Sequence, residues 1–181
     1  MRKENNMNID VESMAIEMPR VEAHPNREEF RGVLTVVDVA SDRSPAGARG
    51  HRVMLTKRAA EEALASLLGM GLDYAPSLDR HDAQRKVGII TRAEIVGQKL
   101  ELGGYLFAKD FPELVRTIRG NGRKTRGGLG MSYEIADARV ADVREAVWKL
   151  TKVTFTGAAI LLREKAAYRE TWIEMTQDGS Q

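Results

Sequence analysis

Residues 86–108 read KVGIITRAEIVGQKLELGGYLFA, and this stretch decides the fold. Apolar and polar residues alternate over 86–96 and again over 99–108, with Gly97-Gln98 between the two runs. Alternation with a period of two is typical of strands, and a two-residue link containing glycine is typical of a hairpin turn. The stretch therefore predicts an antiparallel β-hairpin. Gly103-Gly104 within it indicates a bulge or a close approach of two backbones.

The rest of the chain adds further strands and two helices to this hairpin. Runs rich in apolar and β-branched residues predict four more strands, at 30–39, 51–55, 129–135 and 147–156. Helices are predicted over 57–68, with Thr56 as N-cap, and over 111–119, with Asp110 as N-cap. No glycine-rich phosphate motif joins a strand to a helix. The pattern predicts an α+β fold, with a curved, mostly antiparallel sheet or barrel and a few flanking helices.

Length and composition predict one folded domain. The chain has 181 residues, of which 43% are hydrophobic and 30% charged, as in ordinary globular proteins. Residues 1–27 lack sustained periodicity and are predicted to form a flexible arm. Residues 28–176 are predicted to form the single domain, and residues 177–181 a frayed tail.

Composition also excludes several classes of function. The chain has no cysteine, which excludes disulfides, thiolate metal sites and cysteine nucleophiles. No other metal-ligand motif replaces them, and we expect neither a metal nor a cofactor. No run approaches the roughly 18 apolar residues that span a bilayer, and the N-terminus lacks an apolar signal core. We therefore expect a cytoplasmic protein without a membrane partner.

Charge gives little reason to expect a nucleic-acid partner. The net charge of +2 is close to balance, so the molecule as a whole does not attract a polyanion. Residues 116–126 carry five basic residues and no acid, but no aromatic side chain that could stack on a base. A solvated loop is the favoured interpretation. A nucleic-acid site is the weaker alternative, and a basic rim that steers an acidic peptide towards a nearby serine is a third.

His81 and Ser132 are the candidate catalytic residues. His81 lies in the polar run DRHD, residues 79–82, directly before the hairpin, and Ser132 lies in GGLGMSY, residues 127–133. A serine hydroxyl is a weak nucleophile until a base accepts its proton, and imidazole suits that role. Backbone N–H groups of the nearby glycines are candidates for stabilising an oxyanion. The alternative interpretation is a surface histidine and a strand-edge hydroxyl without a common function.

Three motifs carry a resemblance to a known family. They are LDRHD (78–82) leading into VGII (87–90) and LELGGYLF (100–107), then GMSY (130–133), then WKLTKVTF (148–155) followed by AAI (158–160) and AAY (166–168). In this order they resemble the prohead proteases of tailed bacteriophages, which are assemblin-like serine peptidases related in fold to herpesvirus maturation proteases. The resemblance covers about residues 30–168. It implies an assemblin-like fold with His81 as the base and Ser132 as the nucleophile.

The same resemblance implies a biological role. It implies a serine endopeptidase of prohead maturation that cleaves segments of the phage scaffold and major capsid protein. The implied location is the bacterial host cytoplasm, inside the assembling prohead, or the cytoplasm of a cell carrying a prophage. Self-association is left open.

Two departures from the family pattern concern the site. Glu134 and Ile135 follow Tyr133, where the family often has glycine and an aromatic residue. No acid occupies 154–158, where the family commonly places the residue that orients the histidine. Several residues are candidates for that partner of His81: Thr156, Thr154, Asp79, Asp82 and Glu134. The alternative function is a non-enzymatic capsid-assembly or scaffold component that keeps the fold without a complete triad.

Overall fold

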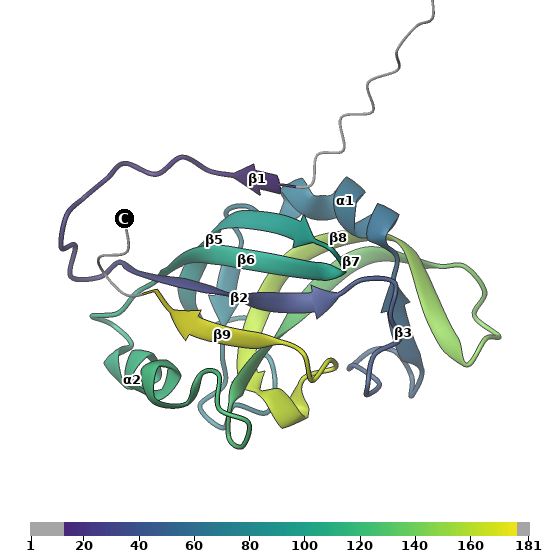
Figure 1. The fold of residues 1–181 in the computed structure, drawn as a ribbon. Helices are drawn as coiled ribbons and strands as arrows, with labels where there is room; N and C mark the ends of the chain where they lie inside the picture. The colour runs from purple at the N-terminus through teal and green to yellow at the C-terminus, as the bar shows by residue number, and fades with distance from the viewer. Residues whose placement is uncertain (1–12, 177–181) are drawn as a thin grey trace, which may run out of the picture.

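The predicted hairpin is present at the centre of the sheet. In the computed structural model, which describes residues 13–176, β5 (Lys86–Val96) pairs antiparallel with β6 (Lys99–Leu106) (Figure 1). Gly97 turns the chain between them with a φ of 62°, a left-handed conformation that favours glycine. The other edge of β6 pairs antiparallel with β2 (Glu28–Val36). The hairpin prediction is confirmed.

A second group of strands is built on one long strand, β8 (Val147–Leu162). One edge of β8 pairs antiparallel with β7 (Leu129–Val140). Its other edge pairs parallel with β3 (Arg52–Leu55) and, further along, with β4 (Gly71–Asp73). Because β4 also pairs with β5, β8 connects to the hairpin and the strands form one sheet.

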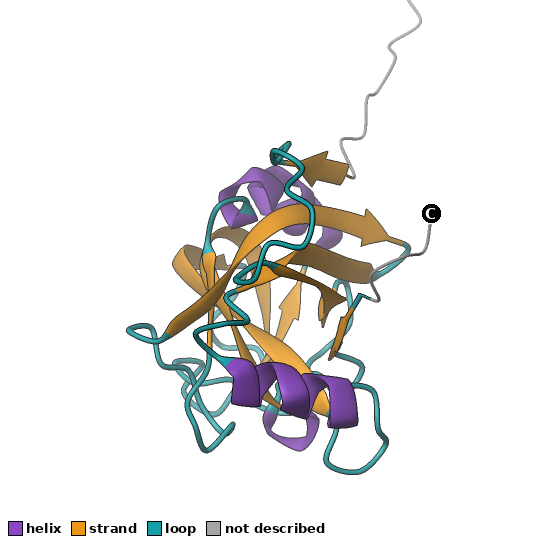
Figure 2. Cartoon of the chain, turned by 90° about the vertical axis from the view of Figure 1, so that its left-hand side faces the viewer, coloured by secondary structure: helices purple, strands orange, loops and turns teal. Residues whose placement is uncertain are grey.

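The sheet curls around one large hydrophobic core, and among the described residues Ala159, Leu161 and Ala166 form a small separate cluster. Its main path runs β3-β8-β4-β5-β6-β2-β9, where β9 (Trp172–Met175) pairs with β2 (Figures 1 and 2). Leu34, Leu72, Ile90 and Phe155 come from different strands and are fully buried in the core. The predicted class, an α+β fold with a curved, mostly antiparallel sheet and a few flanking helices, is confirmed.

Both predicted helices form, but the predicted N-cap is present in α1 and absent in α2. α1 (Lys57–Ala63) begins after Thr56, whose hydroxyl accepts the Ala59 N–H at 3.1 Å, so the predicted N-cap is confirmed. A 3₁₀ turn continues it over Leu64–Leu67. α2 (Pro112–Asn121) instead has Phe111 at its N-cap position, without a side-chain cap.

The predicted N-cap of α2, Asp110, has a different contact. Its carboxylate Oδ2 accepts a hydrogen bond from the Asn26 side chain at 2.9 Å, and Asn26 Oδ1 accepts the Lys109 N–H at 2.9 Å. The carboxylate is therefore used to fix the segment before β2 rather than the first turn of the helix. The capping prediction was wrong because a long-range partner competed for the same group.

Pairing also extends the structure beyond the predicted strands. β7 continues to Val140 through a polar stretch, and β8 continues to Leu162. The two strands pair over most of this length, so ladder hydrogen bonds hold residues that composition alone assigns to a loop. In the segment predicted as a flexible arm, Ser13–Ala15 form β1, which pairs antiparallel with β5. Residues 1–12 and the predicted tail, 177–181, lie outside the described residues.

No helix within residues 13–176 is long and apolar enough to cross a membrane.

The glycine pair in β6 has both of the predicted effects. The β5–β6 register shifts between Ile90 and Arg92, directly opposite Gly104 and Gly103, which marks an irregularity in β5. A Cβ atom at Gly104 would lie 2.0 Å from the Ile89 carbonyl oxygen. Only glycine allows this approach of two backbones without a shift of one strand.

Replacing Gly104 by alanine is expected to destabilise the protein by about 1–3 kcal/mol, because the new methyl group overlaps backbone atoms of β5. Gly120→Ala is the control: a Cβ there meets nothing within 4 Å, and alanine is favoured over glycine in a helix by up to about 1 kcal/mol. Urea unfolding followed by circular dichroism measures both changes. Equal stability of the two variants would contradict this account of Gly104.

Candidate active site

The register of four strands places a row of side chains on one face of the sheet. Lys86 on β5 pairs with Asp73 on β4, Asp73 pairs with Ala159 on β8, and Ala159 pairs with Ser132 on β7. Paired residues project from the same face of a sheet. Asp73 and Ser132 therefore share a face, with their Cα atoms about 10 Å apart, two strand spacings, and Ala159 on the strand between them.

Glu134 extends this row. It lies two residues beyond Ser132 on β7, so both side chains project from the same face, with Cα atoms about 7 Å apart. Its partner on β8 is Gly157. A Cβ at Gly157 would lie 3.3 Å from Glu134 Oε2 and 3.6 Å from Lys86 Nζ. The missing side chain thus leaves room for the carboxylate and the ammonium group over β8.

His81 reaches this face from the loop between β4 and β5. Its Nδ1 lies 2.8 Å from Glu134 Oε1, and the two side chains are 29% and 24% exposed. A carboxylate at this distance holds the proton on Nδ1 and leaves the Nε2 lone pair available. Among residues 13–176, no hydrogen-bond partner faces Nε2.

The loop that carries His81 is held at two points. The Asp82 N–H donates to Asp73 Oδ1 at 2.8 Å, and the Leu162 N–H donates to the Leu78 carbonyl at 2.7 Å. Both bonds attach the loop to the edge of the site. They fix the backbone on either side of His81, so the imidazole does not depend on the contact with Glu134 alone for its position.

Asp73 is the most deeply buried of the three charged residues Asp73, Lys86 and Glu134 that lie near His81. Its side chain is 0% exposed, and Oδ2 forms an ion pair with Lys86 Nζ at 3.6 Å but accepts no hydrogen bond from the described residues. Burial raises the pKa of the Asp73 carboxyl above its ordinary value, the Asp82 N–H opposes this, and the neighbouring Glu134 carboxyl raises the pKa further. Sequence reasoning did not single out Asp73. The available signal was a charged residue at the end of the short apolar segment before Tyr74.

The structure places the five candidates for the partner of His81. Glu134 contacts the imidazole. Asp79 instead accepts the Ser77 hydroxyl, and Asp82 pairs with Arg85 Nε at 3.7 Å. In the described part of the chain, neither Thr154 nor Thr156 forms a hydrogen bond with His81.

Glu134 connects the two candidate catalytic residues, because it contacts His81 and projects from the same face of β7 as Ser132. No hydrogen bond joins the two residues among those the structure describes. Such bonds are often long without substrate and shorten when it binds. Their assignment as nucleophile and base therefore remains a prediction.

Close packing explains two of the glycines before Ser132, and the role of the glycine N–H groups as an oxyanion cradle stays a prediction. The Met131 N–H donates to Thr171 Oγ1 at 3.2 Å, away from β8, so the alternate N–H groups of Gly130 and Ser132 point towards β8. A Cβ at Gly128 would lie 2.0 Å from the Lys124 carbonyl oxygen. A Cβ at Gly130 would lie 2.5 Å from Thr171 Oγ1. The sequence pattern did not anticipate this close approach.

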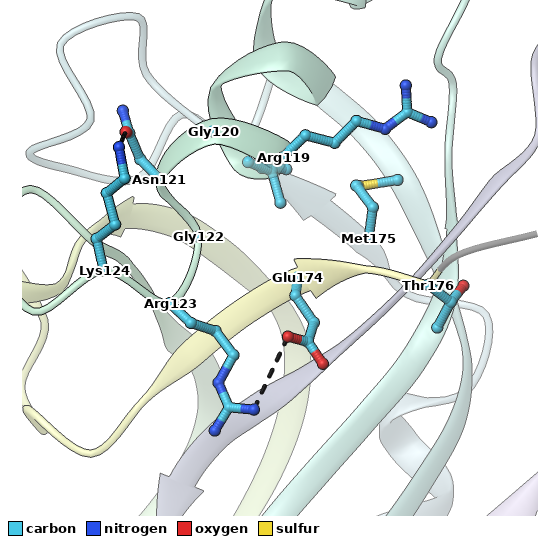
Figure 3. Close-up of a pocket in the computed structure, with 10 residues that line it drawn as sticks. Arg119, Gly120, Asn121, Gly122, Arg123, Lys124, Glu174, Met175 and Thr176 are labelled. Atoms are coloured by element: carbon cyan, nitrogen blue, oxygen red, sulfur yellow. Dashed lines mark hydrogen bonds and ion pairs between the residues drawn. The ribbon is translucent and has the colours of Figure 1, made fainter.

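The basic segment 116–126 borders a pocket that the candidate catalytic residues do not line. Arg119, Arg123 and Lys124 line an open pocket of about 840 Å³ together with Glu174 and neighbouring residues, and His81, Ser132 and Glu134 do not line it (Figure 3). Carboxylates pair with three of the five basic side chains in the segment: Arg116 with Glu113, Arg119 with Glu28, and Arg123 with Glu174. Much of the positive charge is thus compensated within the chain.

Comparisons with known proteins give a similarity of shape. No family model matches the chain, and no curated protein sequence is similar to it. The solved structure of KSHV protease in complex with a hexapeptide phosphonate inhibitor is similar over 83% of this chain, with a TM-score of 0.47 and 12% sequence identity. The similarity covers 66% of the KSHV protease chain, just under two thirds of its length. A match at this level says nothing of the activity, which depends on individual side chains.

Removing the acceptor at Asp73 is expected to loosen the loop that carries His81. In Asp73→Ala the Asp82 N–H loses its partner, and its hydrogen-exchange protection should fall about tenfold, as for a lost hydrogen bond of roughly 1.4 kcal/mol. Asp73→Asn keeps the Oδ1 acceptor and should keep most of the protection. Asp79→Ala, which removes an exposed carboxylate from the same loop, is the second control. Unchanged protection of Asp82 in Asp73→Ala would show that this bond does not fix the loop.

Proposed function

We propose that this chain is a serine endopeptidase in which Ser132 is the nucleophile, His81 the general base and Glu134 the residue that orients His81. The observation that carries the proposal is the contact of 2.8 Å between His81 Nδ1 and Glu134 Oε1, with Ser132 two residues from Glu134 on the same face of β7. Nucleophile, base and orienting carboxylate are the three groups that acyl transfer by serine requires.

The proposed peptide hydrolysis depends on Nε2 of His81, the imidazole nitrogen that does not contact Glu134. As Ser132 Oγ attacks the carbonyl carbon of a peptide bond, His81 Nε2 accepts the hydroxyl proton, and the Glu134 carboxylate stabilises the imidazolium that forms. His81 then gives this proton to the leaving amine as the C–N bond breaks, which leaves an ester on Ser132. Water attacks the ester, with one of its protons passing to Nε2. As the bond between Ser132 Oγ and the carbonyl carbon breaks, Nε2 returns this proton to Oγ, and the carboxylic acid product is released.

The position of Glu134 accounts for the acid that the final strand lacks. Gly157 stands on β8 beside Glu134, and a Cβ there would lie 3.3 Å from the carboxylate, so glycine avoids a tight contact. One strand, β7, therefore supplies both the nucleophile and the orienting acid. This arrangement supports a complete triad. The non-enzymatic alternative was based on the acid missing from residues 154–158, and Glu134 supplies that acid from another strand.

The finer role is proposed from the motif resemblance. We propose a peptidase of phage prohead maturation, acting on scaffold and major capsid protein inside the assembling shell. A modest turnover suffices there, because enclosure holds peptidase and substrate at a high effective concentration. The segment 116–126 offers exposed Lys124 and Arg126 that can attract acidic peptide segments.

Replacing Ser132 by alanine is expected to abolish covalent labelling by a fluorophosphonate, a probe that phosphonylates activated serines. Ser44→Ala is the matched control, because Ser44 is an exposed loop serine whose hydroxyl donates to the carbonyl of the next residue, Pro45. Labelling is measured by intact-protein mass spectrometry. Persistent labelling of Ser132→Ala would reject Ser132 as the nucleophile.

The same two variants test the proposed substrates independently of the peptidase activity. Ser44→Ala should cleave the scaffold and major capsid protein of its phage, and Ser132→Ala should leave both intact. Labelling of Ser132 without cleavage of either protein would keep the peptidase and reject the prohead role. Absence of both would favour a non-enzymatic assembly component.

Replacing Glu134 by glutamine is expected to lower the second-order rate constant of phosphonylation by about 10³–10⁴, because the amide can no longer hold the proton on Nδ1 and stabilise the imidazolium. Asp79→Asn is the control, since Asp79 lies near His81 in sequence but contacts Ser77. Circular dichroism checks that both variants are folded. A folded Glu134→Gln variant with the wild-type rate would show that Glu134 does not support the base.

A further inference from the structure

We propose that Asp73, His81 and Glu134 form a binding site for one zinc ion. One imidazole nitrogen and one oxygen from each carboxyl group lie within 4.8 Å of one another. Three different elements supply them: Asp73 ends β4, His81 comes from the following loop and Glu134 lies on β7. The site itself is independent of the peptidase proposal, and only its effect on catalysis rests on that proposal.

The spacing of the three groups suits a tetrahedral ion. Zinc binds histidine nitrogen and carboxylate oxygen at about 2.0–2.2 Å, which places two ligand atoms about 3.4 Å apart. The contact of 2.8 Å between His81 Nδ1 and Glu134 Oε1 and the outer limit of 4.8 Å bracket this separation. Rotation of the His81 and Glu134 side chains, both partly exposed, is sufficient to bring the atoms around one ion. Three protein ligands leave a fourth position for water.

A second observation, on Asp73 itself, points to a cation. Asp73 is fully buried, and its Oδ2 atom is buried without a hydrogen-bond donor among residues 13–176. A buried carboxylate oxygen without a donor is costly, and a bound ion is one of the ways in which a folded protein offsets that cost. The Lys86 ammonium is the positive group beside it at 3.6 Å, too far for a hydrogen bond, and its side chain is 39% exposed. Lys86 is therefore able to move aside for a metal ion.

The ligand chemistry favours zinc over calcium or magnesium. Calcium and magnesium prefer shells made only of oxygen ligands, whereas zinc accepts imidazole together with carboxylates. The Asp82 N–H donates to Asp73 Oδ1, so it orients the carboxylate from behind and leaves Oδ2 directed at the cluster. A hydrogen bond of this kind to a ligand is typical of metal sites.

Zinc in this site would switch off the proposed peptidase. A metal-bound imidazole no longer accepts a proton from Ser132, and Glu134 cannot both bind zinc and orient Nδ1. Zinc and the catalytic hydrogen bond therefore exclude each other. The same three residues would form an active site without metal and an inhibited one with it.

Direct zinc binding tests the site. Chelator-treated protein is titrated with ZnSO₄ against a chromogenic zinc indicator. Wild type should bind one equivalent, and Asp73→Asn and His81→Ala should each weaken binding at least about tenfold. The controls are His51→Ala and Asp79→Asn, which remove a histidine and an acid outside the cluster. Absence of zinc binding to the wild type, or equal affinity in Asp73→Asn and Asp79→Asn, would overturn the proposal.

A parallel measurement separates this site from the catalytic proposal. Ser132→Ala should bind zinc with wild-type affinity, because Ser132 is not a ligand. Phosphonylation of the wild type should proceed in EDTA and stop at saturating zinc. Zinc binding without any phosphonylation in EDTA would keep the metal site and reject the peptidase. Phosphonylation that is insensitive to bound zinc would reject the inhibitory role.

Discussion

The pairing of β8 on both edges is the constraint on which the rest of the structure depends. Its 16 residues join β7 on one side and both β3 and β4 on the other. Through β4 the strand also connects to the hairpin of β5 and β6. The register along β8 therefore fixes which residues of distant segments become neighbours. A slip by one residue would move Ser132 and Glu134 to the other face of the sheet.

Small residues on β8 convert that register into a site. Gly157 and Ala159 project little or nothing from the face that Ser132, Glu134 and Asp73 share. Asp73 and Glu134 thus come close to each other and to His81 without a large side chain of β8 between them. Their assembly has a cost, since Asp73 is buried beside a second carboxyl group. A cluster that opposes stability in this way is typical of functional sites.

The sequence predicts the fold better than it predicts the site. Alternation gave the hairpin 86–106 and glycine gave its turn, because both signals are local. The lengths of β7 and β8 and the existence of β1 depend on pairing partners far along the chain, which no local pattern reports. Asp110 illustrates the same limit, since Asn26 takes the carboxylate that helix capping would use.

The same division between local signals and long-range contacts applies to the candidate site. His81 and Ser132 stand out by residue type and surroundings, and the two-residue spacing on a strand already places Glu134 beside Ser132. The choice of Glu134 among five candidate partners of His81 requires the path of the loop between β4 and β5, which the Asp82–Asp73 contact sets. Asp73 itself gave almost no sequence signal, because burial and register alone make it part of the cluster.

A crystal structure of the protein after reaction with a peptidyl phosphonate tests the central claim most directly. The account predicts a covalent bond from Ser132 Oγ to phosphorus, with His81 Nε2 within about 3.2 Å of Oγ and Nδ1 still on Glu134. A phosphonate bound to another residue, or an imidazole turned away from Ser132 in the adduct, would contradict it.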